Sequence, residues 1–296
     1  MGNLKIKVIV NPASGGGATR GRWRRFLLPL ESRYGPLNQE FTSCPGEAVH
    51  LTRKALDEGF NYIIGLGGDG TFNEIVNGYM EKDKPVNPDA SLSLLPSGRG
   101  NDFLRSVRGE TGATKTLDLV KVSASGRERY FCNVSSFGMG GEVARRVAKR
   151  GNLLKTAYLA KALSAILSSP ARRVRALVDG REEIRGDYWV GALCNGGYFG
   201  GKMKVSSKAS LEDGWLDLCM VRKVARRDLL PLLINSLTGK APEGSETVRR
   251  RCRSLTLEPL EGGEFPWEYD GELGKGRELF YTVVPGVVKF RIERWT

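Results

Sequence analysis

The stretch 62-YIIGLGGDGTFNEIVNGY-79 joins a short apolar segment, a glycine-rich loop and an amphipathic segment without a gap. Residues 62–66 are rich in branched and aromatic side chains and too few for a helix, so they predict a buried strand of an α/β sheet. A helix is predicted from Thr71, because apolar residues then recur at helical spacing and Thr71 and Glu74 have the spacing of a capping box. Between strand and helix lie Gly67, Gly68 and Gly70. Free N–H groups and the helix dipole at such a place favour a phosphate.

Two further glycine-containing loops follow predicted strands. Residues 5–10 predict a buried strand, and a loop that begins at Asn11 leads to a basic amphipathic helix at about 19–30. Residues 91–95 predict a third strand, followed by the loop 96–102 and a short helix. Three parallel strands would bring these loops to one edge of the sheet, where open α/β sheets bind ligands.

Familiar phosphate-binding motifs do not explain these loops. The spacing G-x-G-x-x-G starts at Gly65, but the next predicted strand ends in Leu95-Pro96 and not in the acidic residue that dinucleotide binding requires. The P-loop motif with its lysine is absent. Asp69 within the loop would repel a bare pyrophosphate, but it would be useful beside a divalent cation or a hydroxyl. From these residues alone, plain tight turns stay an alternative.

The composition narrows the class of protein. With 296 residues the chain is long enough for two domains, and 46 basic against 33 acidic residues give a net charge of +13. The partner is therefore expected to be anionic: a nucleic acid, a membrane surface or a phosphorylated small molecule. Five scattered cysteines and a single histidine exclude a zinc finger. Without a signal-peptide pattern or a membrane-spanning run, we expect a cytoplasmic protein.

The pattern changes near Thr116. From there, short segments keep a period of two, and Asp179-Gly180 and Asp270-Gly271 are typical of hairpin turns. Helical stretches at about 141–169 and 228–237 interrupt the strands. The sequence therefore predicts a mainly antiparallel second domain.

Six motifs in chain order then carry a resemblance. They are NPASGG from Asn11, GLGGDGTFNEIVNG from Gly65, LPSGRGNDFLR from Leu95, NVSSFGMGGEV from Asn133, GGKMKV with ASLEDGWLDL from Gly200, and YDGE from Tyr269. The chain resembles the diacylglycerol kinase catalytic-domain family, in particular the bacterial lipid kinases that are similar to sphingosine and ceramide kinases.

The resemblance implies three parts. Residues 1–120 would form an α/β ATP-binding domain with a Rossmann-like parallel sheet, and residues 121–285 a mainly antiparallel β-sandwich domain for the lipid substrate. Residues 286–296 would return to the first domain. ATP and Mg²⁺ would bind between the two domains.

The resemblance also implies the residues of the site. Those that would contact ATP are Asn11, Ser14, Gly15, Thr42, Gly67, Gly68, Asp69, Gly70, Thr71, Asn73, Glu74, Ser97, Gly98, Arg99, Asn101 and Asp102. Glu272 matches the general base that would take a proton from a lipid hydroxyl. Asp69 is the rival for that role, or a member of the metal network. Asp213 matches an aspartate that holds a structural Mg²⁺ with the carbonyls of Ser210 and Trp215.

Three residues depart from the family. Arg99 stands where threonine or serine is common, and it would either clamp a phosphate or point outward. Ser206 and Ser207 stand where many relatives carry a proline, which leaves the acceptor side open.

The functional prediction is a kinase that transfers phosphate from ATP to a lipid hydroxyl, most simply from diacylglycerol to phosphatidic acid. It would dock peripherally on an anionic membrane through its basic clusters. A helical stretch around Leu153 would either border the lipid or belong to the ordinary core. A soluble NAD-kinase-like enzyme and a catalytically silent nucleotide-binding regulator are the alternatives. Nucleic acid is not an expected partner, because no reading module accompanies the charge. Whether the chain forms a homodimer stays open.

Overall fold

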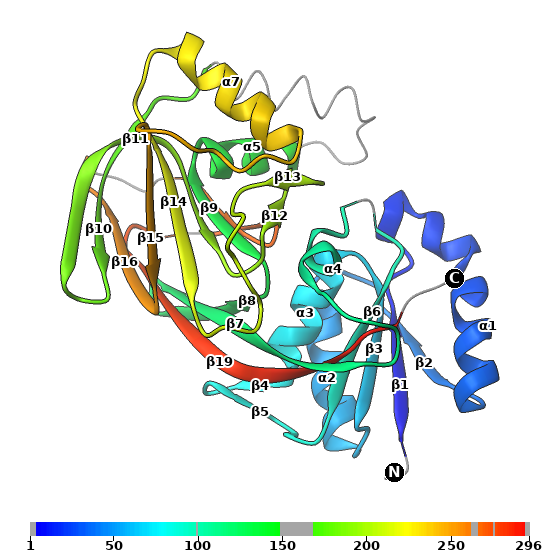
Figure 1. The fold of residues 1–296 in the computed structure, drawn as a ribbon. Coiled ribbons are helices and arrows are strands. Elements are labelled where there is room, and N and C mark those ends of the chain that lie inside the picture. The colour runs from blue at the N-terminus through cyan, green and yellow to red at the C-terminus, as the bar shows by residue number, and fades with distance from the viewer. Residues whose placement is uncertain (1–3, 99, 149–167, 262–265, 275, 294–296) are drawn as a thin grey trace.

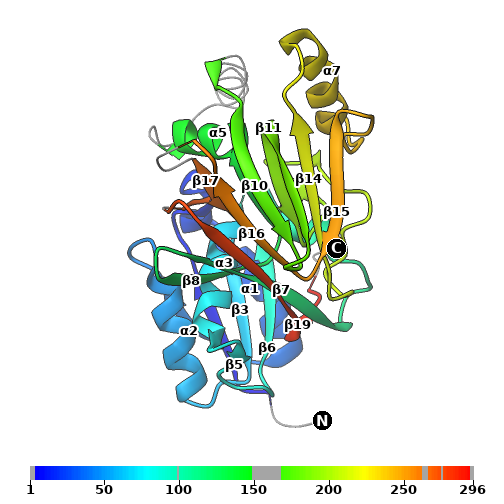
Figure 2. The same cartoon turned by 90° about the vertical axis from the view of Figure 1, so that its left-hand side faces the viewer.

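The computed structural model describes residues 4–98, 100–148, 168–261, 266–274 and 276–293. They form an N-terminal part around a parallel sheet and a C-terminal part of antiparallel strands (Figures 1 and 2). Among these residues, no helix is both long and apolar enough to cross a bilayer.

Four parallel strands make the N-terminal sheet, in the order β6-β3-β1-β2. They are β1 (Ile6–Val10), β2 (Asn38–Phe41), β3 (Tyr62–Gly67) and β6 (Ser91–Pro96). Both faces of β1 and β3 are buried, which explains why these strands have continuous apolar runs. The three predicted strands of this sheet are confirmed.

Helices cover both faces of this sheet (Figure 1). They are the α-helices α1 (Trp23–Tyr34), α2 (Glu47–Asp57), α3 (Asp69–Tyr79) and α4 (Asp102–Ser106), with the short 3₁₀ helices η1 (Ser14–Gly16) and η2 (Ala18–Gly21). Leu27 of α1 packs in the cluster of Val8 and Ile64, whereas α2 and α3 pack on the opposite face, which carries Ile63. The alternation of side chains along each strand thus places one core on either side.

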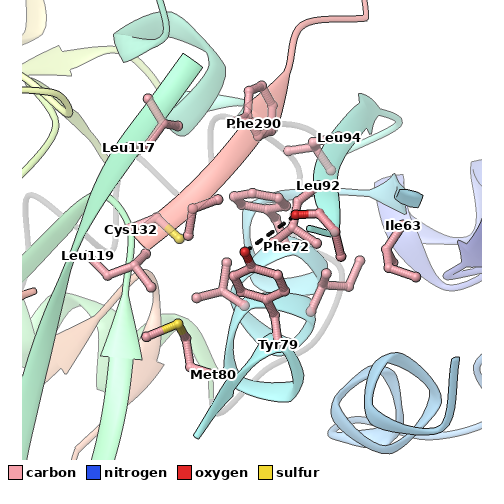
Figure 3. Packing of buried hydrophobic residues seen from close by; sticks show 14 of the residues in the cluster. Ile63, Phe72, Tyr79, Met80, Leu92, Leu94, Leu117, Leu119, Cys132 and Phe290 are labelled. Atoms are coloured by element: carbon pink, nitrogen blue, oxygen red, sulfur yellow. Dashed lines mark hydrogen bonds between the residues drawn. The ribbon is translucent and has the colours of Figure 1, made fainter. Parts of the chain in front are cut away.

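Aromatic packing fixes the two helices that follow the glycine loops. Phe72 of α3 stacks on Phe103 of α4 with ring centroids 4.5 Å apart, and both meet the edge of Phe290. Figure 3 shows Phe72, Tyr79 and Phe290 in this core. The hydroxyl of Tyr79 donates to the carbonyl of Ala90 at 3.4 Å. Because α3 and α4 pack in one core, the glycine loops that precede them are fixed relative to each other.

Most of the C-terminal part consists of antiparallel strands. They are β7 (Thr114–Ala124), β8 (Arg127–Phe131), β9 (Val134–Gly138), β10 (Arg172–Val178), β11 (Glu182–Cys194), β12 (Tyr198–Phe199), β13 (Met203–Lys204), β14 (Leu216–Arg222), β15 (Thr247–Cys252), β16 (Ser254–Pro259), β17 (Trp267–Tyr269), β18 (Glu272–Leu273) and β19 (Leu279–Arg291). The helices α5 (Met139–Ala148) and α7 (Arg226–Leu237) lie beside them. The predicted hairpin turns at Asp179 and Asp270 join β10 to β11 and β17 to β18.

The strand β19 joins the two parts into one sheet. It pairs in antiparallel fashion with β7 and β16, and its end pairs in parallel with β6 through Lys289 and Phe290. The register shifts between Val284 and Val288, where Gly286 adopts a φ of 62°. Glycine adopts this left-handed conformation readily, so Gly286 marks in the sequence the point at which β19 bends. A small hairpin of β4 (Met80–Glu81) and β5 (Lys84–Pro85) lies beside this junction.

Local differences from the sequence prediction have simple causes. The helix predicted at 19–30 is divided into η2 and α1, because the chain leaves helical geometry at Arg22, which has a φ of −124°. The stretch 141–169 begins as α5, while residues 149–167, with Leu153, lie outside the described part. The predicted helix at 228–237 is confirmed as α7.

Candidate active site

The loops that follow β1, β3 and β6 are hydrogen-bonded to one another. The N–H of Asn11 donates to the end of β3 at 2.9 Å, and the N–H of Ser97 donates to the carbonyl of Gly67 at 2.8 Å. A Cβ at Gly98 would lie only 2.6 Å from the Cα of Gly68, so glycine is required for this approach. The predicted meeting of three loops at one sheet edge is confirmed.

The helix α3 begins at Asp69, two residues before the predicted start. No side chain caps it. Thr71 Oγ1 instead accepts a hydrogen bond from Asn11 Nδ2 at 2.9 Å, and the Glu74 carboxylate accepts two N–H groups at the start of α2, at 2.9 and 3.1 Å. The predicted capping box is therefore wrong, because both side chains bind other loops and the helix has already begun. The first N–H groups of α3 still lack helical partners, as at any helix start.

Other residues predicted to contact ATP lie at the same edge. Thr42 follows β2, and its N–H donates to the carbonyl of Val10 at 2.9 Å. A side chain at Gly15 would meet the carbonyl oxygen of Ser97 at 2.6 Å. Ser14 adjoins this glycine in η1.

Buried polar atoms in the third loop support a ligand here. Ser97 Oγ and Asn101 Oδ1 are buried, and neither has a hydrogen-bond partner among the described residues. Since buried polar groups are normally paired, a polar ligand such as a nucleotide phosphate fits this edge. Arg99, between them, lies outside the described residues. Contact of these side chains with ATP stays a prediction.

Asp69 and Asp102 connect the loops to the C-terminal part. The Asp69 carboxylate accepts the N–H groups of Asp102 at 3.1 Å and Phe103 at 3.3 Å, so it holds the start of α4. The Asp102 carboxylate accepts the N–H groups of Gly201 at 2.6 Å and Lys202 at 2.9 Å. Burial raises the pKa of both carboxyl groups, against the opposing effect of these N–H groups.

A cavity of about 280 Å³ lies between the two parts of the chain and carries four carboxyl groups. We call it the acidic cavity; it is lined by Asp69, Asp102, Asn133, Val134, Val143, Ala144, Phe199, Gly200, Glu268, Asp270 and Gly271. Its carboxyl groups come from α3, α4 and the hairpin of β17 and β18. It has the combination of apolar walls and a few converging polar groups that is typical of ligand sites.

Asp270 is the most extensively hydrogen-bonded of these carboxylates. It accepts the N–H groups of Cys132 at 2.8 Å, Asn133 at 3.0 Å and Val134 at 3.2 Å, and the side-chain amide of Asn73 at 3.1 Å. Burial nevertheless raises its pKa to about 6. The hairpin turn is thereby attached to α3 and to the segment between β8 and β9.

Glu268 is completely buried and was not among the predicted site residues. Its carboxyl group accepts the N–H of Gly271 at 2.9 Å and is hydrogen-bonded to the hydroxyl of Ser136. Burial raises the pKa of Glu268 to about 8. Sequence reasoning took Asp270 only as a turn residue and passed over Glu268. The available signal was the three acids within 267-WEYDGE-272, which a tight turn brings together on one hairpin.

Glu272 lies over the glycine loop. A Cβ at Gly70 would be 3.8 Å from Glu272 Oε1, although the two residues are separated by most of the chain. Although Glu272 is exposed on the turn, desolvation by the surrounding protein raises the pKa of its carboxyl group, and the negative charge of Glu74 raises it further. The carboxylate therefore approaches the start of α3, where the sequence predicts the phosphates.

The residues of the predicted structural Mg²⁺ site lie apart from the acidic cavity. Asp213 is paired with Arg251 and accepts the N–H of Trp215 at 3.0 Å. The hydroxyl of Ser210 accepts the N–H of Glu212 at 3.3 Å. Among the described residues, no group of three or more histidine, cysteine or acidic side chains is arranged to hold a metal ion. The metal-binding role of this loop stays a prediction.

Comparisons with known proteins identify the class and the family. Residues 5–129 match the diacylglycerol kinase catalytic domain, and residues 133–291 match the YegS C-terminal NAD kinase beta sandwich-like domain. Together with relatives named as diacylglycerol kinases or lipid kinases, these two matches identify a lipid kinase, and the predicted fold class is confirmed. The chain belongs to the diacylglycerol kinase catalytic-domain family, in its bacterial lipid kinase branch.

Several relatives match nearly end to end. The diacylglycerol kinase of Staphylococcus carnosus is 26% identical over 282 residues, which cover 91% of this chain and 89% of the relative. A probable YegS-like lipid kinase of Pseudomonas fluorescens is 29% identical over 260 residues, which cover 83% and 82%. The crystal structure of a putative diacylglycerol kinase from Bacillus anthracis superposes with a TM-score of 0.76 at 21% identity, over 99% and 98% of the two chains. This last likeness concerns the fold.

Proposed function

We propose that this lipid kinase transfers the terminal phosphate of ATP to the hydroxyl of diacylglycerol and so forms phosphatidic acid and ADP. The observation that carries the proposal is the approach of Glu272 to Gly70, 3.8 Å from where a Cβ would stand. A carboxylate from the second domain thus faces the phosphate-binding edge of the first. The relatives named diacylglycerol kinase support this choice of acceptor.

Each group at the edge has a task in this reaction. N–H groups at the start of α3, with the loops around Asn11 and Ser97, would bind the phosphates of ATP. Glu272 would take the proton of the lipid hydroxyl as its oxygen attacks the terminal phosphorus, and ADP would leave with the former bridging oxygen. The raised pKa of Glu272 brings this carboxylate nearer to the range suited to a general base at neutral pH.

Carboxylate oxygens are the ligands that Mg²⁺ prefers, and Asp69 is the residue of the acidic cavity that adjoins the glycine loop. Asp69 would hold the ion with the nucleotide phosphates, and the ion would supply charge neutralisation. Asp213, with the carbonyls of Ser210 and Trp215, would hold the second ion. Burial raises the pKa of Asp213 and the charges of Asp118 and Asp217 raise it further, against the opposing N–H of Trp215 and the charge of Arg251.

The lipid acceptor requires contact with a bilayer, and we propose a peripheral one. The net charge of +13 favours an anionic surface, toward which each nearby basic side chain contributes about 1 kcal/mol. In this arrangement the protein would touch the surface of the bilayer, and no segment would need to cross it.

Phosphate transfer from γ-labelled ATP with Mg²⁺ tests the proposal. The acceptors are diacylglycerol in anionic and in neutral vesicles, phosphatidylglycerol, sphingosine, NAD and none. We expect labelled phosphatidic acid, formed faster on anionic vesicles. Glu272→Gln should lower the rate about 100-fold or more, because the proton acceptor is lost. Glu243→Gln, a matched change at an exposed glutamate, should leave the rate unchanged.

Two results would contradict the proposal. Label in NAD and not in lipid would point to a soluble NAD kinase. A Glu272→Gln variant with full activity would remove Glu272 from the reaction and leave Asp69 as the candidate base.

A further inference from the structure

A second cavity, of about 240 Å³, adjoins the acidic cavity. We call it the basic cavity; it is lined by Arg105, Ser106, Arg108, Gly197, Tyr198, Lys204, residues 206–211 and Glu212. Tyr198 lines the basic cavity, whereas its neighbour Phe199 lines the acidic one. Because successive side chains of a strand point to opposite faces, β12 separates the two cavities.

Positive charge dominates the lining of the basic cavity. Four of its side chains are cationic, and its single acid, Glu212, is paired with Lys115 at 3.0 Å. Within the described part of the chain, Arg108, Lys204 and Lys208 make no ion pair, and Arg105 lies 3.7 Å from the carboxylate of Asp102. Like charges around one hollow repel one another, and a bound anion would relieve this repulsion.

The framework of the basic cavity is fixed by local hydrogen bonds. Ser206 is buried, and its Oγ accepts the N–H groups of Lys208 and Ala209, both at 3.1 Å, while it donates to Asp217 at 2.7 Å. This turn sets the direction in which Lys208 leaves the backbone. On the facing side, Ser106 Oγ accepts the N–H of Gly197 at 3.1 Å. A fixed rim with mostly exposed cationic side chains can adapt to a small anion.

We propose that the basic cavity binds a phosphate monoester group, as a second anion site distinct from the nucleotide site. A dianion carries enough charge for several cations, and guanidinium and ammonium groups bind phosphate oxygens by charge-assisted hydrogen bonds. Exposed hydroxyls such as that of Ser207 supply further donors. The cavity also has room for a short polar group beyond the phosphate. The phosphate would come either from a free phosphate ester or from the headgroup of a phospholipid such as phosphatidate.

The first arm of the test uses soluble probes. Protein with Mg²⁺ and a non-hydrolysable ATP analogue, which occupies the nucleotide site, is titrated calorimetrically with inorganic phosphate and with glycerol 3-phosphate. Arg108→Gln/Lys208→Gln removes two exposed charges from the rim. Arg127→Gln/Arg181→Gln removes two exposed charges elsewhere. We expect saturable binding that the first pair weakens about tenfold or more and the second pair leaves unchanged.

The second arm uses the same three proteins and sedimentation with vesicles of phosphatidylcholine that contain phosphatidate. Loss of binding in the rim variant here, without soluble binding in the first arm, assigns the site to the lipid headgroup. If the rim variant binds the soluble probes of the first arm more weakly than the wild type, the site is assigned to a free phosphate ester. Equal behaviour of all three proteins in both arms, or equal weakening by both double variants, overturns the proposal. Neither arm measures phosphate transfer, so failure here is separate from failure of the proposed reaction.

Discussion

The acidic and the basic cavity differ in how their charges are held. Each carboxyl group of the acidic cavity is fixed by N–H or hydroxyl donors, and the donors come from other loops or strands. The cations of the basic cavity are mostly exposed, and three of them have no ion-pair partner in the described part of the chain. The acidic cavity is therefore part of the framework, whereas the basic cavity is a feature of the surface.

This difference has a physical origin. Burying a carboxylate costs free energy unless hydrogen bonds compensate for the lost water, so acids between two domains must be fixed or protonated. Both outcomes occur on one hairpin, since Asp270 has four donors and a pKa of about 6, while Glu268 has a pKa of about 8. Long cationic side chains can keep their charge in water and need no such frame.

The largest effect is expected from Asp270→Ala. The change removes the side-chain acceptor of three backbone N–H groups and one of the two acceptors of the Asn73 amide, in a buried place. We expect the free energy of unfolding to fall by about 3 kcal/mol or more, measured by urea unfolding. Asp270→Asn keeps one acceptor oxygen and should cost less. Asp89→Ala, at an exposed aspartate, should change stability by less than about 0.5 kcal/mol. A similar small cost at Asp270 would show that the acidic cavity is not a framework.

The second effect concerns pH. Between the unfolded pKa of Glu268, near 4.5, and its folded pKa, about 8, the folded chain binds a proton that the unfolded chain has lost. The stability from this proton is complete below the unfolded pKa and is lost as pH rises through the folded pKa. Glu268→Gln removes this dependence. We expect the stability of the wild type, relative to this variant, to fall by about 2 kcal/mol between about pH 5.5 and about pH 7.5.

Urea unfolding of both proteins across this pH range provides the measurement. Asp270, with a raised pKa, contributes in the same direction to both proteins, so the difference between them reports Glu268 together with its interaction with Asp270. The exposed Glu243→Gln should follow the wild type at every pH. Parallel curves for wild type and Glu268→Gln would mean that Glu268 ionises normally and that its burial does not determine its charge.

The parts of the site that are local in sequence could be predicted. The strand, the glycine loop and the helix at residues 62–79 follow from apolar spacing and from glycine, and both are properties of neighbouring residues. The same local rule failed at Thr71 and Glu74, whose partners lie in the loop of Asn11 and at the start of α2. Spacing can suggest a capping box, but it cannot show that the two side chains bind elsewhere. Their actual partners are distant in sequence.

The acidic cavity could be predicted only in part. Asp69 and Asp102 stand in recognisable loops, but the pairing of Asp270 with the N–H of Cys132 spans 138 residues and depends on how β9 and β17 meet. Nor does any local pattern show that Glu268 is fully buried, since an acidic residue on a short strand is usually exposed. The basic cavity could not be predicted for the same reason, because its cations come from α4 and the segment after it, from β13 and from the turn at Lys208.

The smallest effect is expected from Arg108→Gln/Lys208→Gln in the absence of phosphate. Neither side chain has an ion pair within the described residues, and both face other cations, so their removal takes away repulsion and no partner. The free energy of unfolding should stay the same or rise by less than about 0.5 kcal/mol. Added phosphate should then stabilise the wild type more than the variant. An anion that binds only the folded protein raises its free energy of unfolding, and the variant would bind this anion more weakly. A loss of more than about 1 kcal/mol without phosphate would mean that these cations hold the turn at Ser206 in place. The basic cavity would then be framework, like the acidic one, and the contrast between the two would disappear.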